Sequence, residues 1–497
     1  MLPPWESKVV LCFTSCLRYP VRGGFSIAWL AKVAICWFLL LGVVVANLPE
    51  AWAQTSRLRV SANGRYLETA EGQPFFYLGD TAWELFHRLN REEAELYLRD
   101  RAAKGFTVIQ AVVLAELDGL QSPNAYGHIP LVDLDPTRPL VVEGPENDYW
   151  DHVDWIVNRA QELGLFMGML PTWGDKWNKK WGRGPEIFDA ENALRYGEWL
   201  GRRYRDKPII WILGGDRNPE SDRHLEIIRA MAQGLRRGDG GAHLLTYHPQ
   251  GGGNSARWFH NDEWLNFNMF QSGHSEPNLP NYRTTYETYL LRPQKPVLDG
   301  EPRYEDHPIG WNAEKGWFDD WDVRQAAYWS MLSGACGHTY GNHNIWQMYA
   351  PGRSPVASAR TPWQQALRHP GSAQMGYMKK LFSLRPFWKL VPDQSIVAGS
   401  ELSGADHRRA SRADDGSFLM VSLPTGGSVE VTLSALQGDR IRAWWFDPRT
   451  GLGRLIGEEP RKSRVRYQAP GSGRGHDWVL VLDSLAAQLP PLTAPAH

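Results

Sequence analysis

Two stretches of the sequence place a carboxylate where it could do chemistry. In "WILGGDRN" (211–218) and "PVLDGEPR" (296–303), a hydrophobic run leads through glycine to Asp216 and Glu301, respectively. Glycine at such a position tolerates unusual dihedral angles and lets backbone or ligand approach closely. One carboxyl group can protonate a leaving group while the other attacks, which is the chemistry of glycoside hydrolysis.

A purely structural interpretation of the same residues remains open. Asp216 could cap the helix that follows it, and Glu301 could pair with Arg303 or Arg217. Further carboxylates crowd the second stretch, and we expect them to hold the loop around Glu301 (Asp299, Glu305 and Asp306).

Eight apolar runs of strand length alternate along the chain with segments of helical periodicity. The predicted strands are 74–80, 106–114, 165–173, 209–216, 243–249, 265–273, 296–301 and 337–343. The predicted helices are 91–105, capped by Asn90, then 148–164, 191–207, 224–237, 282–291, 322–336 and a broken one over 363–384. This order predicts an α/β fold of the (β/α)8 TIM-barrel class. An open doubly wound sheet is disfavoured because neither GxGxxG nor GxxxxGK is present.

In a (β/α)8 barrel the chemistry lies at the carboxyl ends of the strands. The strand ends here carry polar and aromatic side chains, which we predict to bind substrate: Asp80, Trp83, Gln110, Trp173, Lys176, Trp177, Asn218, His248, Gln271 and His343. The loop 173–186 mixes tryptophans with lysines and an arginine, which would suit an acidic polysaccharide. A solvated basic loop with tryptophan packed beneath it fits that composition equally well.

The pattern of the sequence changes after Pro392, where helical periodicity ends. Short alternating strands with turn signals predict a small C-terminal β-sandwich over 393–485, following a catalytic domain over 56–390. The proline-rich end, 486–497, is predicted to be disordered.

The first 53 residues resemble an export signal. Basic residues precede the apolar run "VAICWFLLLGVVVA", and Ala51-Trp52-Ala53 supplies a small-x-small cleavage pattern. We therefore expect a periplasmic or extracellular protein without stable membrane insertion, although a retained anchor is the alternative. Cleavage would leave Cys336 as a lone cysteine.

Composition and missing motifs exclude other classes of protein. The 497 residues carry a net charge of -1, without the basic excess of a nucleic-acid binder. Neither HExxH nor GxSxG occurs, which disfavours a zinc protease and a serine esterase. The spacing of His248, His260, Asp262 and His274 matches no firm metal site, so we predict no metal and no cofactor.

Several long motifs resemble one known family, the apiosidase-like glycoside hydrolases. They are "FFYLGDTAWELFHRLNREEA", "KGFTVIQAVVLAELDG", "LPTWGDKWNKKWG", "IIWILGGDRNPE", "PVLDGEPRYEDHP" and "CGHTYGNHNIWQMY". The likeness covers about residues 56–485, and the family consists of exported bacterial barrel enzymes with a C-terminal β domain named for collagen binding. The resemblance implies cleavage at apiose in the pectin rhamnogalacturonan II, with an aspartate and a glutamate that match Asp216 and Glu301.

By analogy with retaining barrel enzymes, the resemblance makes Asp216 the acid/base and Glu301 the nucleophile. Many such barrels have Asn-Glu where this chain has Gly-Asp, which leaves the roles and retention open. The implied partner is a plant cell-wall polysaccharide or oligosaccharide, bound by a monomer. Two alternatives remain: hydrolysis of another furanoside, such as an arabinofuranoside, and a non-catalytic protein that binds carbohydrate or matrix.

Overall fold

The structure of the protein is a computed structural model that describes residues 57–399 and 402–492. The predicted export signal, 1–53, and three of the cysteines lie outside the described residues. The remaining cysteine, Cys336, is a buried free thiol. Across the described ranges, no helix is both long enough and apolar enough to cross a membrane.

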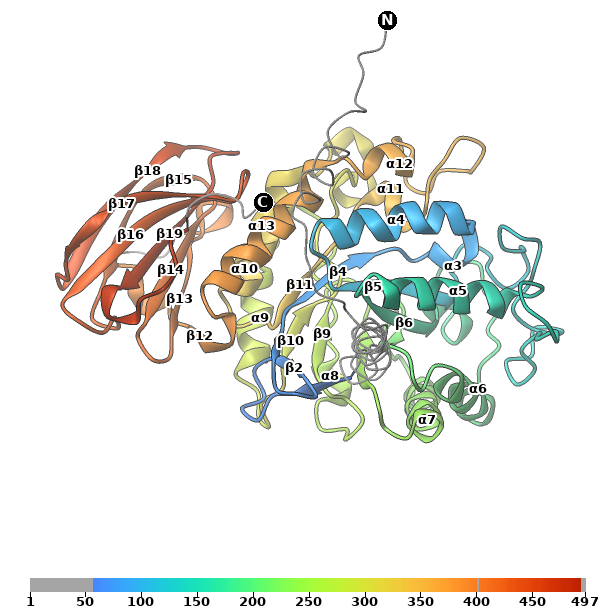
Figure 1. Cartoon of the computed structure of the whole chain (residues 1–497). Helices are drawn as coiled ribbons and strands as arrows, with labels where there is room; N and C mark the ends of the chain where they lie inside the picture. Colours follow the sequence, from blue (N-terminus) through green and yellow to red (C-terminus); the bar gives the residue numbers. More distant parts are fainter. Residues whose placement is uncertain (1–56, 400–401, 493–497) are drawn as a thin grey trace, which may run out of the picture. The chain divides into compact units, whose positions relative to one another are not determined.

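Eight parallel strands within residues 57–399 form the predicted barrel (Figure 1). Six make one ladder in the order β11-β4-β5-β6-β7-β8, and β9 pairs with β10. The bounds are β4 Tyr77–Thr81, β5 Val108–Leu114, β6 Phe166–Thr172, β7 Ile209–Gly214, β8 Leu244–His248, β9 Asn268–Phe270, β10 Val297–Asp299 and β11 Gly337–Tyr340. Single backbone hydrogen bonds bridge the two gaps in the ladder, from Asn266 N to Leu245 O (2.9 Å) and from Cys336 N to Val297 O (3.0 Å).

The strands are apolar along their whole length because both of their faces are covered. All seven residues of β5 are buried, as expected for a parallel strand between a packed interior and a layer of helices. Inside the barrel, Tyr77 Oη donates to Gln110 Oε1 (2.9 Å), and Gln110 Nε2 donates to Gly300 O (3.1 Å). These bonds satisfy polar groups in the core and tie β4, β5 and the end of β10 together.

The helices follow the strands in the predicted order. Longer helices are α4 Arg91–Ala103, α5 Tyr149–Glu162, α6 Ala190–Arg203, α7 Asp222–Asp239, α9 Asn281–Tyr289, α10 Asp320–Met331 and α13 Pro370–Leu384. Short ones are α3 Leu85–Arg88, α8 Ala256–Phe259, α11 His343–Trp346 and α12 Trp363–Ala366. The predicted cap is confirmed: Asn90 Oδ1 accepts from Glu93 N (2.8 Å) and Glu93 Oε2 accepts from Asn90 N (3.1 Å).

The first predicted strand, 74–80, is divided in the structure. Pro74–Phe75 forms β3, which pairs antiparallel with β2 (Leu67–Thr69), and β2 pairs with β1 (Leu58–Val60). The barrel strand β4 starts only at Tyr77. A continuous apolar run therefore serves two sheets, a change of partner that periodicity alone does not reveal.

The predicted antiparallel β domain is present at the C-terminal end of the chain. One sheet has the order β12-β13-β14-β19-β16-β17, and β15 pairs with β18. The strands are β12 Leu390–Pro392, β13 Arg409–Ala413, β14 Phe418–Leu423, β15 Gly426–Thr432, β16 Arg440–Asp447, β17 Leu452–Pro460, β18 Arg464–Ser472 and β19 Trp478–Ser484. Buried side chains of the two sheets form one apolar cluster, which includes Val421, Val431 and Leu480.

The end of the chain differs from the prediction of a disordered tail over 486–497. Leu492 is buried, and its carbonyl accepts a hydrogen bond from Gly453 N (2.8 Å). Burial of this side chain and pairing of its backbone hold the segment against β17, despite the prolines that precede it. Residues 493–497 lie outside the described part.

Candidate active site

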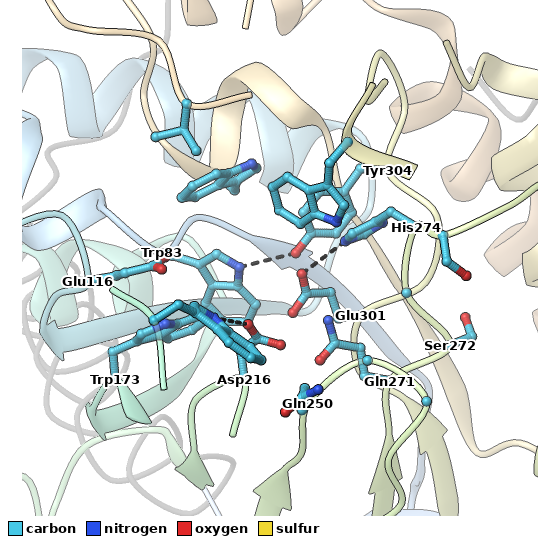
Figure 2. A pocket seen from close by; sticks show the side chains of 18 of the residues that line it. Trp83, Glu116, Trp173, Asp216, Gln250, Gln271, Ser272, His274, Glu301 and Tyr304 are labelled. Carbon is cyan, nitrogen blue, oxygen red and sulfur yellow. Dashed lines mark hydrogen bonds and ion pairs between the residues drawn. The ribbon is translucent and has the colours of Figure 1, made fainter. Parts of the chain in front are cut away.

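A pocket of about 600 Å³ lies where the carboxyl ends of the barrel strands meet (Figure 2). Such a volume is typical of a small-molecule site. The lining residues are Trp83, Glu116, Trp173, Trp181, Asp216, Gln250, Gly251, Gly252, Gln271, Ser272, Gly273, His274, Ser275, Leu279, Glu301, Tyr304, Trp311, Trp346 and Val356. The pocket therefore combines aromatic rings with three carboxyl groups and two amides.

Asp216 reaches the pocket through a tight turn after β7. Gly214, Gly215 and Asp216 all have positive φ angles, of 98°, 84° and 55°. A Cβ on Gly214 would lie 2.3 Å from His248 O, so glycine is required there for both dihedral and space. A non-glycine residue in the left-handed region costs about 1–3 kcal/mol, a strain that clusters at functional sites. The turn thus fixes the direction of the Asp216 carboxyl.

Glu301 stands at the end of β10 between two imidazoles. Its Oε2 lies 3.0 Å from His248 Nε2, and its Oε1 lies 3.1 Å from His274 Nε2. Gly300 precedes it because a Cβ there would lie 2.5 Å from Met269 Sδ. Figure 2 shows Glu301 facing the pocket opposite Asp216.

The structural interpretation of the two carboxylates does not match these contacts. The N-cap of α7 is Ser221, not Asp216. Arg303 donates to Gln325 Oε1 (3.0 Å) and to backbone carbonyls instead of pairing with Glu301.

The three further carboxylates of the second stretch hold its loop, as expected. Asp299 accepts from Ser272 Oγ (2.7 Å), Glu305 accepts from Gly371 N (3.1 Å), and Asp306 accepts from Asn344 Nδ2 (2.9 Å). Each contact joins the end of β10 or the segment after it to a neighbouring segment of the chain. Glu301 is therefore left as the carboxylate of this stretch that lines the pocket.

The surroundings separate the pKa values of the catalytic candidates. Burial, and next the negative charge of Glu301, raise the pKa of Asp216 to about 6. Burial alone would raise the pKa of Glu301, but the contacts with His248 and His274 lower it to about 2. Between these values Asp216 is protonated while Glu301 is ionised. Two carboxyl groups with pKa values pushed apart in this way are matched to the roles of acid and nucleophile.

Tryptophan rings form much of the pocket wall. Trp83 Nε1 donates to Tyr304 Oη (3.1 Å), and the ring centroids of Trp83 and Trp173 are 5.3 Å apart. Trp181 Nε1 donates to Asp216 Oδ2 (3.3 Å), while Trp311 is 55% exposed at the rim. Flat rings that combine an apolar face with a polar edge suit the stacking of sugar rings.

The structure brings some of the predicted substrate-binding residues to the pocket. Trp83, Trp173 and Gln271 line it, and His248 is not among the lining residues but contacts Glu301. Others lie outside the lining. Asp80 is buried with Tyr97 and Arg101, and Gln110 fills the barrel interior.

Four more of those residues have structural contacts outside the pocket lining. Lys176, in a short turn over Gly174–Lys176, is fully buried, and its Nζ donates to Ala115 O and Asp175 Oδ1 (both 2.7 Å). Trp177 Nε1 donates to Gly214 O (3.1 Å), and Asn218 Oδ1 accepts from Gln250 N (3.1 Å). His343 Nε2 lies 3.1 Å from Val356 O. Lys176 is thus not placed to bind a substrate carboxylate, because its charge is already paired inside the fold.

Several pocket residues escaped the sequence-based prediction. They are Glu116, Gln250, Tyr304, Trp311 and Trp346. Trp181 belongs to the loop 173–186, for which sugar binding was one interpretation of the sequence, and His274 was considered from the sequence only as a metal ligand. Glu116 follows the predicted strand 106–114 by two residues and Tyr304 follows Glu301 closely, so position after a strand was an available signal. Trp311 comes from the long segment between β10 and α10, and Trp346 is the last residue of the short helix α11. Neither stands directly at a strand end.

A protein-family model described as "Apiosidase-like, catalytic domain" matches residues 61–389. The chain belongs to this family. A second model, "Putative collagen-binding domain of a collagenase", matches residues 391–483 of this apiosidase-like protein. No curated protein matches it.

Solved structures agree with the family assignment. A structure described as "Glycoside hydrolase" is 37% identical with a TM-score of 0.80, over 86% of this chain and 97% of the other. A family 5 glycoside hydrolase from Bacteroides vulgatus ATCC 8482 is 35% identical with a TM-score of 0.81, over 86% of this chain and 94% of the other. The apiosidase-like protein is accordingly a glycoside hydrolase whose substrate is a carbohydrate.

Proposed function

We propose that this glycoside hydrolase cleaves an apiose linkage in the side chains of rhamnogalacturonan II, with Asp216 as acid/base and Glu301 as nucleophile. The observation that carries the roles is the position of the Glu301 carboxylate between two imidazoles, 3.0 Å from His248 Nε2 and 3.1 Å from His274 Nε2. Against the effect of burial, these contacts lower the pKa of Glu301, whereas burial and the charge of Glu301 raise the pKa of Asp216. The family to which the chain belongs supports apiose as the substrate.

The reaction proceeds in two displacements. The Glu301 carboxylate attacks the anomeric carbon, the bond from that carbon to the leaving oxygen breaks, and the Asp216 proton moves to this oxygen. Asp216, now ionised, then takes a proton from water, whose oxygen attacks the same carbon and releases Glu301. Two inversions at one carbon retain the configuration.

The character of the pocket supports a neutral sugar as its occupant. Asp216, Glu301 and Glu116 line it together with five tryptophans. A negatively charged sugar in the pocket would be repelled by the ionised Glu301. Positive charge lies on the exposed loop beside Trp181, where Lys179 and Arg183 are exposed. A galacturonate-bearing leaving group is expected on this side, where these charges would attract its carboxylates.

The protein is expected to act outside the cytoplasm, as an exported monomer on plant cell-wall material. Support for export comes from the pattern of the first 53 residues of the sequence.

The deciding experiment incubates residues 54–497 with rhamnogalacturonan II and with its isolated side chains. Mass spectrometry identifies the products, and NMR follows the first-formed anomer. An oligosaccharide ending in apiose, released with retained configuration, is the expected result. Absence of product from these substrates, with product from an arabinofuranoside, would replace apiose by another furanoside. The Glu301→Gln variant, which keeps the shape of the side chain, serves as the inactive control.

A further inference from the structure

Glu116 is a carboxyl group in the pocket that the proposed mechanism does not use. It follows β5 by two residues, lines the pocket and is partly exposed to it. In Figure 2 it faces the cavity from the side of Trp83, apart from Glu301.

The backbone on both sides of Glu116 is held in place. The carbonyl of Ala115 accepts from Lys176 Nζ (2.7 Å), and the N–H of Leu117 donates to Glu84 Oε1 (2.9 Å). The fixed backbone sets the point from which the side chain enters the pocket, so no backbone order has to be gained when a ligand binds.

The Glu116 carboxyl itself has no hydrogen-bond or ion-pair partner among residues 57–399 and 402–492. Its oxygens are open to the pocket and have no partner in the described part of the protein, so they are available to an atom of a ligand that enters the pocket. Hydroxyl groups of a sugar are the natural partners for such a group.

Negative charge dominates the surroundings of this carboxyl. Asp216, Asp175 and Glu84 raise its pKa, and Arg217 lowers it. The nearby Lys176 ammonium is paired with Asp175. The Arg217 guanidinium already donates to the carbonyls of Asn178 (3.1 Å) and Asp216 (2.7 Å). Burial first, and then these carboxylates, raise the pKa of Glu116 to about 8.

We propose that Glu116 binds a sugar hydroxyl as an uncharged carboxylic acid and is thereby a specificity-determining residue of the pocket. The neutral group offers one O–H donor and a carbonyl acceptor, whereas the ionised group only accepts. A hydroxyl can therefore donate to and accept from the neutral side chain at once. This inference rests on the proposed hydrolysis, but Glu116 exchanges no proton with the substrate.

The first test compares Glu116→Gln with Glu116→Ala by steady-state kinetics at pH 5. Glutamine is isosteric with the neutral acid and keeps a donor and an acceptor, so kcat/KM should stay within about threefold of wild type. Alanine leaves the hydroxyl unpaired, and kcat/KM should fall about 10- to 100-fold, mainly through KM. Thermal unfolding of each variant separates this loss from misfolding.

The second test measures binding without turnover. In a Glu301→Gln background, the Kd of the substrate is followed from pH 5 to pH 9 with Glu116 present and with Glu116→Gln added. Asp216 loses its proton below pH 8 in both proteins, so it affects their affinities alike. With Glu116 present, affinity should weaken further above about pH 8, where this group loses its proton, whereas with glutamine no such second change should appear. The Glu301→Gln background prevents turnover and keeps Asp216, the carboxyl with the largest charge effect on Glu116, in place.

Two results would overturn the inference. Wild-type kinetics for Glu116→Ala would show that no hydroxyl depends on this group. A loss in Glu116→Gln as large as in Glu116→Ala would show that an ionised or proton-transferring carboxyl is needed. Hydrolysis of the apiose linkage by the wild type is measured independently of these variants, and its result tests the proposed function. If an arabinofuranoside is hydrolysed instead of the apiose linkage, the same variants are compared on that substrate.

Discussion

The backbone N–H of Asp216 donates to Nδ1 of His248 over 3.2 Å. Because Nδ1 accepts this bond, the ring proton resides on Nε2, and that nitrogen lies 3.0 Å from Glu301 Oε2. One imidazole from β8 therefore connects the strained turn that carries the acid with the carboxylate that attacks.

Removal of each catalytic carboxyl should affect the two steps differently. With a natural leaving group, Asp216→Ala and Glu301→Ala should both lower kcat by about 10²-fold or more. With a leaving group of low pKa, no acid is needed, so Asp216→Ala should still form the glycosyl-enzyme, detectable by mass. Accumulation of that species in Glu301→Ala, and not in Asp216→Ala, would reverse the two roles.

The pH profile should report the two pKa values. Glu301 must be ionised, so activity should fall as pH drops through about 2; Asp216 must be protonated, so kcat/KM should fall as pH rises through about 6. The optimum is expected near pH 4. Measurement of kcat/KM from pH 3 to pH 8 checks the basic limb, and a profile still level at pH 8 would contradict the role of Asp216 as acid.

Replacement of His248 should change the ionisation of Glu301. In His248→Phe the carboxylate stays buried but loses one imidazole, so its pKa rises and the acidic limb of the profile moves upward. At a pH one unit below the new pKa, only about a tenth of the enzyme would be ionised. His260→Phe is the control, because His260 is buried but contacts Asn268 and does not line the pocket. An acidic limb that moves equally in both variants would rule out a specific effect.

Gly251 should limit the size of the sugar. Its φ is not in the left-handed region, and an added Cβ would meet only Gln271 Nε2, at 3.9 Å, so the protein itself does not require glycine there. Because Gly251 lines the pocket, Gly251→Ala should crowd the ligand at a cost of about 1–3 kcal/mol. KM should rise about tenfold or more without a change in Tm.

The matched control for this change is Gly457→Ala in β17. That position also has no left-handed φ and nothing within 4 Å of an added Cβ, but it lies in the β domain. Equal kinetics for Gly251→Ala, Gly457→Ala and wild type would show that the ligand does not reach Gly251.

The sequence was sufficient for the barrel and for the position of its two main carboxylates. Apolar runs bounded by glycine, proline and polar residues predicted all eight barrel strands, because a parallel strand covered on both faces must be apolar throughout. In a closed parallel barrel every carboxyl end lies at one face, so Asp216 and Glu301 could be predicted to share a site from their places after two strands. The antiparallel β domain was predicted from a different pattern, the alternation of apolar and polar residues along short strands.

The tertiary structure decided which side chains at that face enter the pocket. Lys176 and Glu116 both follow barrel strands closely, yet the lysine turns inward to Asp175 and the glutamate faces the cavity. Beyond the end of a strand, the direction of a side chain depends on its exact position and on the path of the loop. A periodic sequence pattern therefore does not predict which side chains enter the pocket. The ionisation of Glu301 likewise depends on His248 and His274, which arrive from two other barrel segments only when the barrel closes. Sequence thus determined the fold and the pair of carboxylates, while three-dimensional proximity determined their charges and their neighbours.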